Sequence, residues 1–164
     1  MDEIRVVPYD AGWVKLFEEA ATQLEKLFPN AQIEHIGSTS VVGLDAKPII
    51  DIMLGVESLT DGEIIRKLES VGYKHWKEDT FQNERLFFTK WDSEKKNRLV
   101  HIHATVIGND FWKDQIRFRD ILRSKPEIAH EYAILKKQLA ERLKNDRDGY
   151  TEAKTEFVKK ILSQ

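Results

Sequence analysis

The stretch "EHIGSTSVVGLDAKPIIDIML", residues 34–54, decides the fold, because two short apolar runs flank a Gly-Ser turn. The runs "QIEHI" and "PIIDIML" are rich in β-branched residues and predict two strands, joined through a brief helical piece at residues 40–44. The second run carries a lone carboxylate, Asp51, which is costly to bury unless it is paired or binds a metal. The stretch is therefore either a phosphate-binding turn with a metal ligand or a tight connection between two buried strands.

Helices are expected on both sides of this stretch in the chain. Apolar residues recur at intervals of three and four over residues 11–28, behind Asp10 as an N-cap, and again over residues 61–70. From Asp110 onward the same periodicity predicts three successive helices, and Pro126 stands where the second of them would begin. Most of the helical content is thus expected near the C-terminus.

Three more strands are expected between these groups of helices, at residues 73–76, 84–91 and 98–107. The polar loop "DSEKKN" would join the last two as a hairpin. The chain has 164 residues and a hydrophobic content of 41%, which fits a single domain covering residues 1–164. The predicted architecture is α+β, with a mixed sheet on which the three C-terminal helices pack.

The composition excludes several classes of protein. The apolar runs are only a few residues long, whereas a membrane-spanning helix needs about 20, and no cationic start precedes an apolar segment. The chain has no cysteine, which fits a cytoplasmic protein. The C-terminal third is slightly basic and the remainder slightly acidic, a contrast too weak for a surface that binds long nucleic acid. Binding of a small anionic ligand is not excluded by this distribution of charge.

The Gly-Ser turn has the residues of an anion site. Gly37 allows a close backbone approach, and the hydroxyls of Ser38 and Thr39 follow at once. A carboxylate at Asp51 could hold Mg²⁺ against the same phosphate. The alternative is purely structural, with Gly37 serving the turn, Ser38 or Thr39 capping the short helix, and Asp51 bonding to nearby backbone.

Five segments together resemble the GrpB family, whose members are placed by resemblance in the nucleotidyltransferase fold superfamily. They are "VVPYDAGWVKLFEEA", "IEHIGSTSVVGLDAKPIIDIMLGV", "LVHIHATVIG", "FRDILRSKPEIAHEYAILKKQLA" and "DRDGYTEAKTEFV". The match covers nearly the whole chain in the right order, and the block "HIGSTSVVGLDAKPIID" is specific. The resemblance implies a nucleotidyltransferase-like fold and nucleotide handling, without a defined reaction.

The chain departs from the wider superfamily at one position. Active nucleotidyltransferases carry two acids separated by one residue after the Gly-Ser turn, and a third acid on a neighbouring strand. Here Gly37, Ser38 and Asp51 match, but Met53 stands where the second acid would be. Residues two apart share a strand face, and a thioether cannot replace a carboxylate for Mg²⁺. A mechanism with two metal ions is therefore not expected.

Two histidines stand on the strand where the third acid is expected. His101 and His103 share a face of "LVHIHATV", so both could lie beside Asp51. Asp51 and His103 are then candidate metal ligands, for Mg²⁺ or Mn²⁺, or for Zn²⁺ where the imidazoles take part. All three residues are candidates for catalysis, with a histidine as general base. The alternative is a polar, half-exposed sheet face.

Five basic residues are candidate contacts for the anion. Lys47 precedes the strand of Asp51, and Arg85 begins "RLFFTKW". Arg119 and Arg123 are four apart and share a helical face, as Lys136 does with Tyr132. Guanidinium groups bind phosphate in a bidentate way. The alternative pairs the two helical arginines with acids on a solvated surface.

These observations predict a protein that binds a nucleotide or a small phosphorylated ligand in a cleft. If it is an enzyme, we expect transfer of a nucleotidyl group to a small acceptor. One alternative is a binding or regulatory module that lost the second acid and with it the chemistry. A further alternative is a metal-dependent hydrolase that uses Asp51, His101 and His103.

Overall fold

The computed structural model of the chain describes residues 3–60, 62–79 and 84–164. Its helices and strands follow one another in the order that the sequence predicts. In chain order these are α1 (Gly12–Leu27), β1 (Gln32–Ile36), the 3₁₀ helix η1 (Ser38–Ser40), β2 (Ile50–Val56), α2 (Glu63–Ser70), β3 (Lys74–His75), β4 (Arg85–Trp91), β5 (Arg98–Val106), α3 (Asp110–Ser124), α4 (Pro126–Arg142) and α5 (Arg147–Leu162). The α+β class is confirmed, as are the β4–β5 hairpin and the helix that starts at Pro126.

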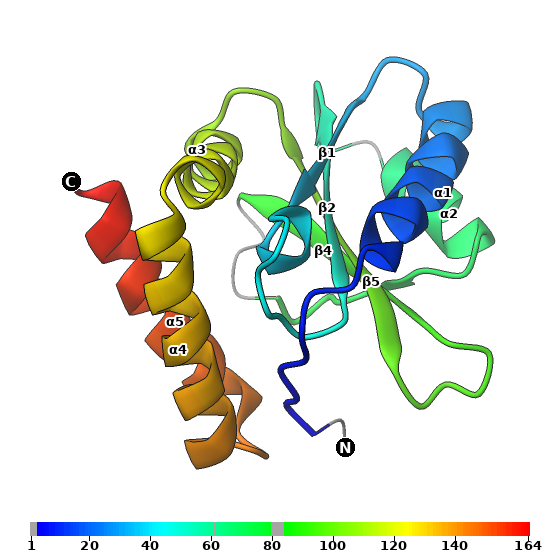
Figure 1. Ribbon diagram of the computed structural model, residues 1–164. Helices are drawn as coiled ribbons and strands as arrows, with labels where there is room; N and C mark the ends of the chain where they lie inside the picture. The colour runs from blue at the N-terminus through cyan, green and yellow to red at the C-terminus, as the bar shows by residue number, and fades with distance from the viewer. Residues whose placement is uncertain (1–2, 61, 80–83) are drawn as a thin grey trace.

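The strands form one mixed sheet in the order β1-β2-β5-β4-β3 (Figure 1). Strands β2 and β5 run parallel, and the other neighbours are antiparallel. The register places Asp51 opposite His101 and Met53 opposite His103. Because residues opposite each other share a face and residues two apart share it too, all four side chains lie on the same side of the sheet.

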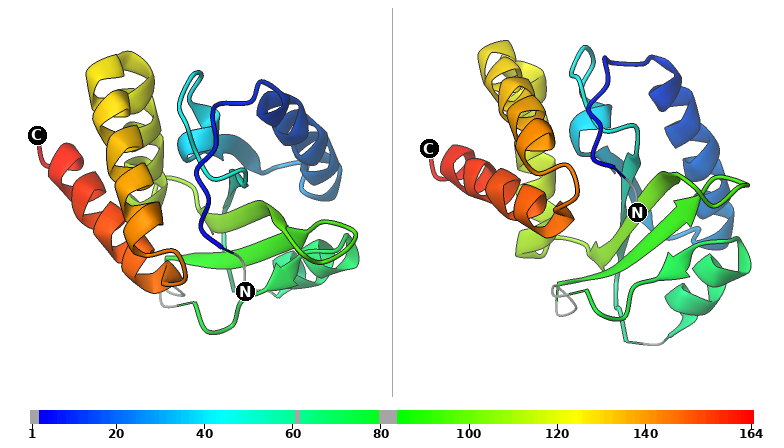
Figure 2. Two further views of the ribbon diagram at one scale, coloured as in Figure 1. Left: turned by 60° about the horizontal axis from the view of Figure 1, so that its bottom comes forward. Right: turned by 90° about the horizontal axis from the view of Figure 1, so that it is seen from below.

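The other side of the sheet carries the main apolar core, beneath α1 and α2. Both helices cover this side of the sheet (Figure 2). Alternate residues of β2 and β5 pack against them. The cluster contains Trp13 and Leu24 of α1, Ile64 and Leu68 of α2, and the strand residues Ile50, Ile52, Leu54, Phe88, Val100, Ile102 and Ala104. This layer fixes which residues of β2 and β5 face the opposite side.

Helices α3, α4 and α5 lie on the opposite side of the sheet from α1 and α2 (Figures 1 and 2). The register and the contact of Met53 with Trp112 show that this is the side of Asp51. Helix α3 approaches the sheet closely at Gly55, where a side-chain carbon would lie 2.5 Å from the Trp112 ring. Trp112 also packs with Met53 and Ile36 in a small buried cluster. Helices α4 and α5 pack against α3 and the loop after η1 through Phe118, Leu122, Tyr132, Phe157 and Ile161.

Two local expectations differ from the structure. The helical piece expected at residues 40–44 is the 3₁₀ turn Ser38–Ser40, because Gly43 has φ +82°, which a right-handed helix does not include. The N-cap position of α1 falls on Ala11, although Asp10 Oδ1 accepts a hydrogen bond of 2.7 Å from the Gly12 amide. Residue 61, the expected start of the second helix, lies outside the described residues.

In the part of the chain that the structure describes, no helix is long and apolar enough to cross a membrane.

Candidate functional site

Asp51 stands at the centre of the polar side chains on this sheet face. Its Oδ1 atom lies 3.1 Å from His103 Nε2 and 3.4 Å from His101 Nδ1. The parallel pairing of β2 with β5 produces this arrangement, since His101 stands opposite Asp51 and His103 stands opposite Met53 on the same face. The three residues singled out for catalysis therefore lie in direct contact.

Gly37 and Asp51 form the second contact of the site. The backbone of Gly37 has φ 72° and ψ −175°, a conformation that is essentially restricted to glycine. A side-chain carbon built on Gly37 would lie 2.7 Å from Asp51 Oδ2, closer than real carbon atoms approach. The turn and the carboxylate are thus packed so tightly that any side chain at residue 37 would displace Asp51.

The tautomer of His103 follows from its second neighbour, Arg85. Nη1 of Arg85 lies 2.5 Å from His103 Nδ1, and an arginine nitrogen can only donate. Nδ1 is therefore the acceptor, and the proton on Nε2 is donated to Asp51 Oδ1. Burial and the charge of Arg85 lower the pKa of His103 to about 4, against the attraction of Asp51, so the ring is neutral at pH 7.

Asp51 is held as an anion by these neighbours. Burial by itself would raise the pKa of Asp51, but hydrogen bonds with His101 and His103 keep it well below the usual range of a carboxyl group. Burial lowers the pKa of His101 as well, against the attraction of Asp51. The Nε2 atom of His101 is buried and has no hydrogen-bond partner among the described residues. His101 therefore has one buried ring nitrogen that no described residue satisfies.

The hydroxyls of the Gly-Ser turn face different partners. The Ser38 hydroxyl hydrogen-bonds with the Tyr132 side chain, so it lies on the side of α4. The Thr39 hydroxyl, predicted to contact phosphate, is buried and lies 3.0 Å from His35 Nε2. His35 in turn stacks on Phe17 of α1, on the opposite side of the sheet. The Thr39 hydroxyl therefore lies on the side of the sheet away from Asp51.

The two arginines of α3 share a face, as predicted, and contact the protein itself. Arg119 donates to Glu34 Oε2 at 2.6 Å and to the His35 carbonyl at 3.1 Å. Arg123 donates to the Ser40 carbonyl from two nitrogens, at 3.0 and 2.8 Å. In this conformation both guanidinium groups fix β1 and the turn in place. Their role as anion contacts stays a prediction.

Lys47 and Lys136 approach the same region from the sequence before β2 and from α4. Lys47 Nζ lies 4.9 Å from the centre of the Tyr150 ring, and Lys136 Nζ lies 4.9 Å from that of Tyr132. Lys136 also donates to the Asp45 carbonyl at 2.6 Å. Burial lowers the pKa of both lysines to about 7, and nearby cations add to the effect. Both predicted lysines therefore belong to a basic layer beside the site.

The donor set at Asp51 does not fit two metal ions. Met53, at the position of the second acid, is fully buried against Ile36 and Trp112. Within the described residues, no group of three or more histidine, aspartate or glutamate side chains could hold a metal ion. His101 and His103 direct ring nitrogens at Asp51 Oδ1 and not at a common point. A metal held by Asp51 and His103 stays a prediction.

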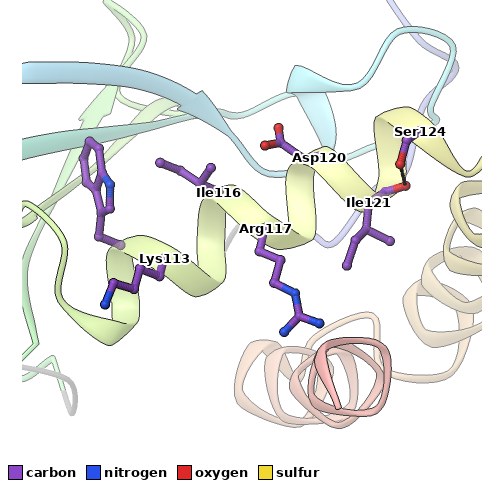
Figure 3. Close-up of a pocket in the computed structure, with 7 residues that line it drawn as sticks. Lys113, Ile116, Arg117, Asp120, Ile121 and Ser124 are labelled. Carbon is purple, nitrogen blue, oxygen red and sulfur yellow. Dashed lines mark hydrogen bonds between the residues drawn. The ribbon is translucent and has the colours of Figure 1, made fainter. Parts of the chain in front are cut away.

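Two hollows on the surface lie away from Asp51. A shallow one of about 560 Å³ runs along α3, where Arg117 reaches toward α5 and donates to the Leu162 carbonyl (Figure 3). A larger one of about 1060 Å³ lies between α1, the loop after η1 and α4, with Val14, Val42 and Ile134 on its walls. Neither is lined by Asp51, His101 or His103.

One cation of the site was not predicted from the sequence. Lys154 of α5 lies with its Nζ atom 4.7 Å from the centre of the Tyr150 ring, and burial lowers its pKa. The available signal was the spacing of four between Tyr150 and Lys154, which places both on one helical face. Nothing in that spacing indicates that this face meets Lys47.

Comparisons with known proteins place the chain in a family. The model of the GrpB family, described as "GrpB protein", matches residues 3–164. The glutamate-rich protein GrpB of Alkalihalophilus pseudofirmus is 36% identical, over 99% of this chain and 95% of that protein. A UPF0157 protein of Pseudomonas aeruginosa is 38% identical, over 99% of this chain and 68% of that protein.

Solved structures agree with this placement. The crystal structure of the conserved protein GrpB from Enterococcus faecalis superposes with a TM-score of 0.79 at 34% identity, over 96% of this chain and 99% of that one. The Cid1 poly(U) polymerase bound to MgATP superposes with a TM-score of 0.53 at 12% identity, over 80% of this chain and 42% of that one, so the nucleotidyltransferase-like fold is shared. The chain belongs to the GrpB family.

Proposed function

We propose that this protein binds a nucleoside triphosphate beside the Gly37-Ser38 turn, with Asp51 holding one divalent cation, and transfers the nucleotidyl group to a small acceptor. The observation that carries the proposal is the contact between Gly37 and Asp51 Oδ2, which leaves room for no side chain between turn and carboxylate. A phosphate on the turn would lie within reach of a cation on Asp51. The fold shared with Cid1, whose structure carries MgATP, supports a nucleotide as the ligand.

The transfer step needs a nucleophile, a leaving group and a proton acceptor. An acceptor hydroxyl oxygen forms a bond to the α-phosphorus, the bond from that phosphorus to the bridging oxygen of the β-phosphate breaks, and pyrophosphate leaves. Nε2 of His101 would take the hydroxyl proton, which its lack of a hydrogen-bond partner among the described residues and the contact of its other ring nitrogen with Asp51 support. Positioning and charge neutralisation supply most of the rate in such transfers.

A second candidate is a module that binds the nucleotide without turnover. The burial of Met53 favours it, because the place of the second acid is filled by a side chain that packs on Trp112. Both candidates bind the nucleotide, and only the first transfers the nucleotidyl group.

Calorimetric titration tests the binding step. ATP, GTP, CTP and UTP are titrated in turn with Mg²⁺ or Mn²⁺ into the wild type and into Asp51→Asn. We expect saturable binding of at least one nucleotide, and loss in Asp51→Asn of the extra affinity that the cation provides. Absence of binding under every combination overturns the proposal. If wild type and Asp51→Asn bind the nucleotide with equal affinity in the presence of the cation, Asp51 does not hold a cation and that part of the proposal is overturned.

Pyrophosphate release tests the transfer step. The nucleotide that binds is incubated with the protein and with small alcohols and amines as acceptors, and pyrophosphate is measured by a coupled assay. Release that is lost in His101→Gln, with nucleotide affinity kept, supports the enzyme. Binding without release for all acceptors overturns the transfer step and supports the module without turnover.

A further inference from the structure

Three lysines from three separate parts of the chain meet beside the Gly37-Ser38 turn. Lys47 precedes β2, Lys136 belongs to α4 and Lys154 to α5. The Nζ atoms of Lys47 and Lys154 lie 4.9 and 4.7 Å from the centre of one ring, that of Tyr150. Two ammonium groups on a single ring indicate a concentration of positive charge at this point.

Tyr132 connects the third lysine to the turn. Lys136 Nζ lies 4.9 Å from the centre of the Tyr132 ring, and the Tyr132 hydroxyl hydrogen-bonds with Ser38. Tyr132 and Lys136 are both buried, at 6% and 2% exposed. The lysines and the turn are therefore parts of one layer between the sheet and the C-terminal helices.

Positive groups gather in this layer. Lys47 is surrounded by Lys154, Arg147 and Arg98, with Asp51 opposing them. Burial and the charge of Arg147 lower the pKa of Lys154, and the charge of Asp51 raises it.

Lys136 has Lys154 and Lys137 near it, opposed by Asp45, whose carboxylate is already paired with Lys137 at 2.5 Å. Burial lowers the pKa of all three clustered lysines, to about 7 for Lys47 and Lys136, and the neighbouring cations lower it further. A bound anion would relieve both effects.

Two buried polar atoms of residues near Lys47 have no hydrogen-bond partner among the described residues. The Tyr150 hydroxyl is buried and accepts or donates no hydrogen bond among the described residues, and the same holds for His101 Nε2. Tyr150 is only 1% exposed. Buried polar atoms are nearly always paired in folded proteins. The Tyr150 hydroxyl can donate and so points to a phosphate oxygen as its partner, whereas His101 Nε2 can only accept while Nδ1 faces Asp51 and so points to a ligand hydroxyl.

We propose that Lys47, Lys136 and Lys154 form a cradle for a polyphosphate chain and supply the positive charge that a second divalent cation would otherwise supply. The position of Met53 leaves the second cation without its carboxylate, and the ammonium groups stand on the same side of the sheet. The inference rests on the proposed function in one respect, namely that the polyphosphate belongs to a nucleotide. The cradle itself recognises phosphate.

Calorimetric titration of inorganic tripolyphosphate and of ATP, each with Mg²⁺ and with EDTA, tests the cradle. Both anions are expected to bind in EDTA, with dissociation constants within about tenfold of those with Mg²⁺. Titrations at pH 7 in two buffers of different ionisation enthalpy should also show net proton uptake, because the anion raises the pKa of Lys47 and Lys136.

Lys154→Met and Lys159→Met form the matched pair of variants. Both remove one lysine charge from α5, but the Lys159 side chain is 71% exposed and lies 3.9 Å from Glu156. Lys154→Met should weaken tripolyphosphate binding by about tenfold to a hundredfold, since hydrogen bonds to charged groups contribute about 1.5–3 kcal/mol. It should keep or raise the melting temperature, because it removes an incompletely paired buried charge. Lys159→Met should leave binding unchanged.

The outcomes distinguish failure of the cradle from failure of the proposed function. If MgATP binds but tripolyphosphate does not, or if Lys154→Met binds tripolyphosphate like Lys159→Met, the cradle is overturned and nucleotide binding stands. If tripolyphosphate binds and no nucleoside triphosphate does, the cradle stands and the proposed function is overturned. If neither binds, both are overturned.

Discussion

Arg85 determines which nitrogen of His103 carries the proton, because Nη1 of Arg85 lies 2.5 Å from His103 Nδ1. Asp79 in turn fixes Arg85 through two hydrogen bonds of 3.0 Å. The chain of contacts ends at Asp51, whose Oδ1 atom accepts the proton of His103 Nε2. A side chain on β4 thus sets the orientation of the carboxylate on β2 without touching it.

Arg85→Gln should raise the pKa of His103 from about 4 part of the way toward 6.5, because burial still lowers it but the charge of Arg85 no longer does, while Asp51 raises it. The shift is followed by NMR titration of the histidine ring signals between pH 4 and 8. Arg117→Gln is the control, since Arg117 donates to the carbonyls of Leu162 and Gln164. A His103 that still titrates near pH 4 in Arg85→Gln would contradict the contact.

Acid should destabilise the protein already between pH 6.5 and pH 4. Burial lowers the pKa of His35 to about 4 from 6.5, so in this window the unfolded chain binds a proton that the folded protein does not. Stability therefore falls as the pH falls, by about 1–3 kcal/mol for this residue. His103 acts in the same window with the same sign.

His35→Gln should flatten this pH dependence while keeping a hydrogen-bonding group near Thr39. Urea denaturation at pH 7 and pH 5 measures the difference in the free energy of unfolding. An unchanged difference in His35→Gln would show that His35 is not buried as a neutral ring.

Restoring the acid at residue 53 should damage the fold. Met53 is 0% exposed and packs with Ile36 and Trp112, so Met53→Asp would bury a charge without a partner. We expect a loss of more than about 3 kcal/mol in the free energy of unfolding, against less than about 1.5 kcal/mol for Met53→Leu. Equal stability of the two variants would mean that the sheet face is open to solvent at this position.

Local patterns in the sequence were sufficient to bring Asp51, His101 and His103 together. Alternation along a strand places His101 and His103 on one face, and the run of apolar residues around Asp51 identifies the neighbouring strand. The same rule predicted that Met53 shares the face of Asp51, which the register confirms. The start of α4 at Pro126 also follows from a local signal.

The partners of individual side chains depended on tertiary packing, which no local pattern contains. Thr39 was predicted to contact phosphate, yet its hydroxyl bonds with His35 on the other side of the sheet. Arg119 and Arg123 share a face as predicted, but that face meets β1 and the turn. Lys154 joins the site only because α5 folds back against the region before β2.

The central claim, that the turn and Asp51 bind one phosphate ligand, is tested most directly by Gly37→Ala against Gly108→Ala. Both glycines have positive φ, but a side-chain carbon on Gly37 would meet Asp51 Oδ2 at 2.7 Å, whereas no atom of the described residues lies within 4 Å of one on Gly108. Both variants should lose about 1–3 kcal/mol of stability from backbone strain.

The decisive measurement is calorimetric titration of the four ribonucleoside triphosphates with Mg²⁺ into both variants, at a temperature where both are folded. Nucleotide affinity should fall at least about tenfold in Gly37→Ala and stay within about twofold of the wild type in Gly108→Ala. Equal nucleotide affinity in the two variants would contradict the claim.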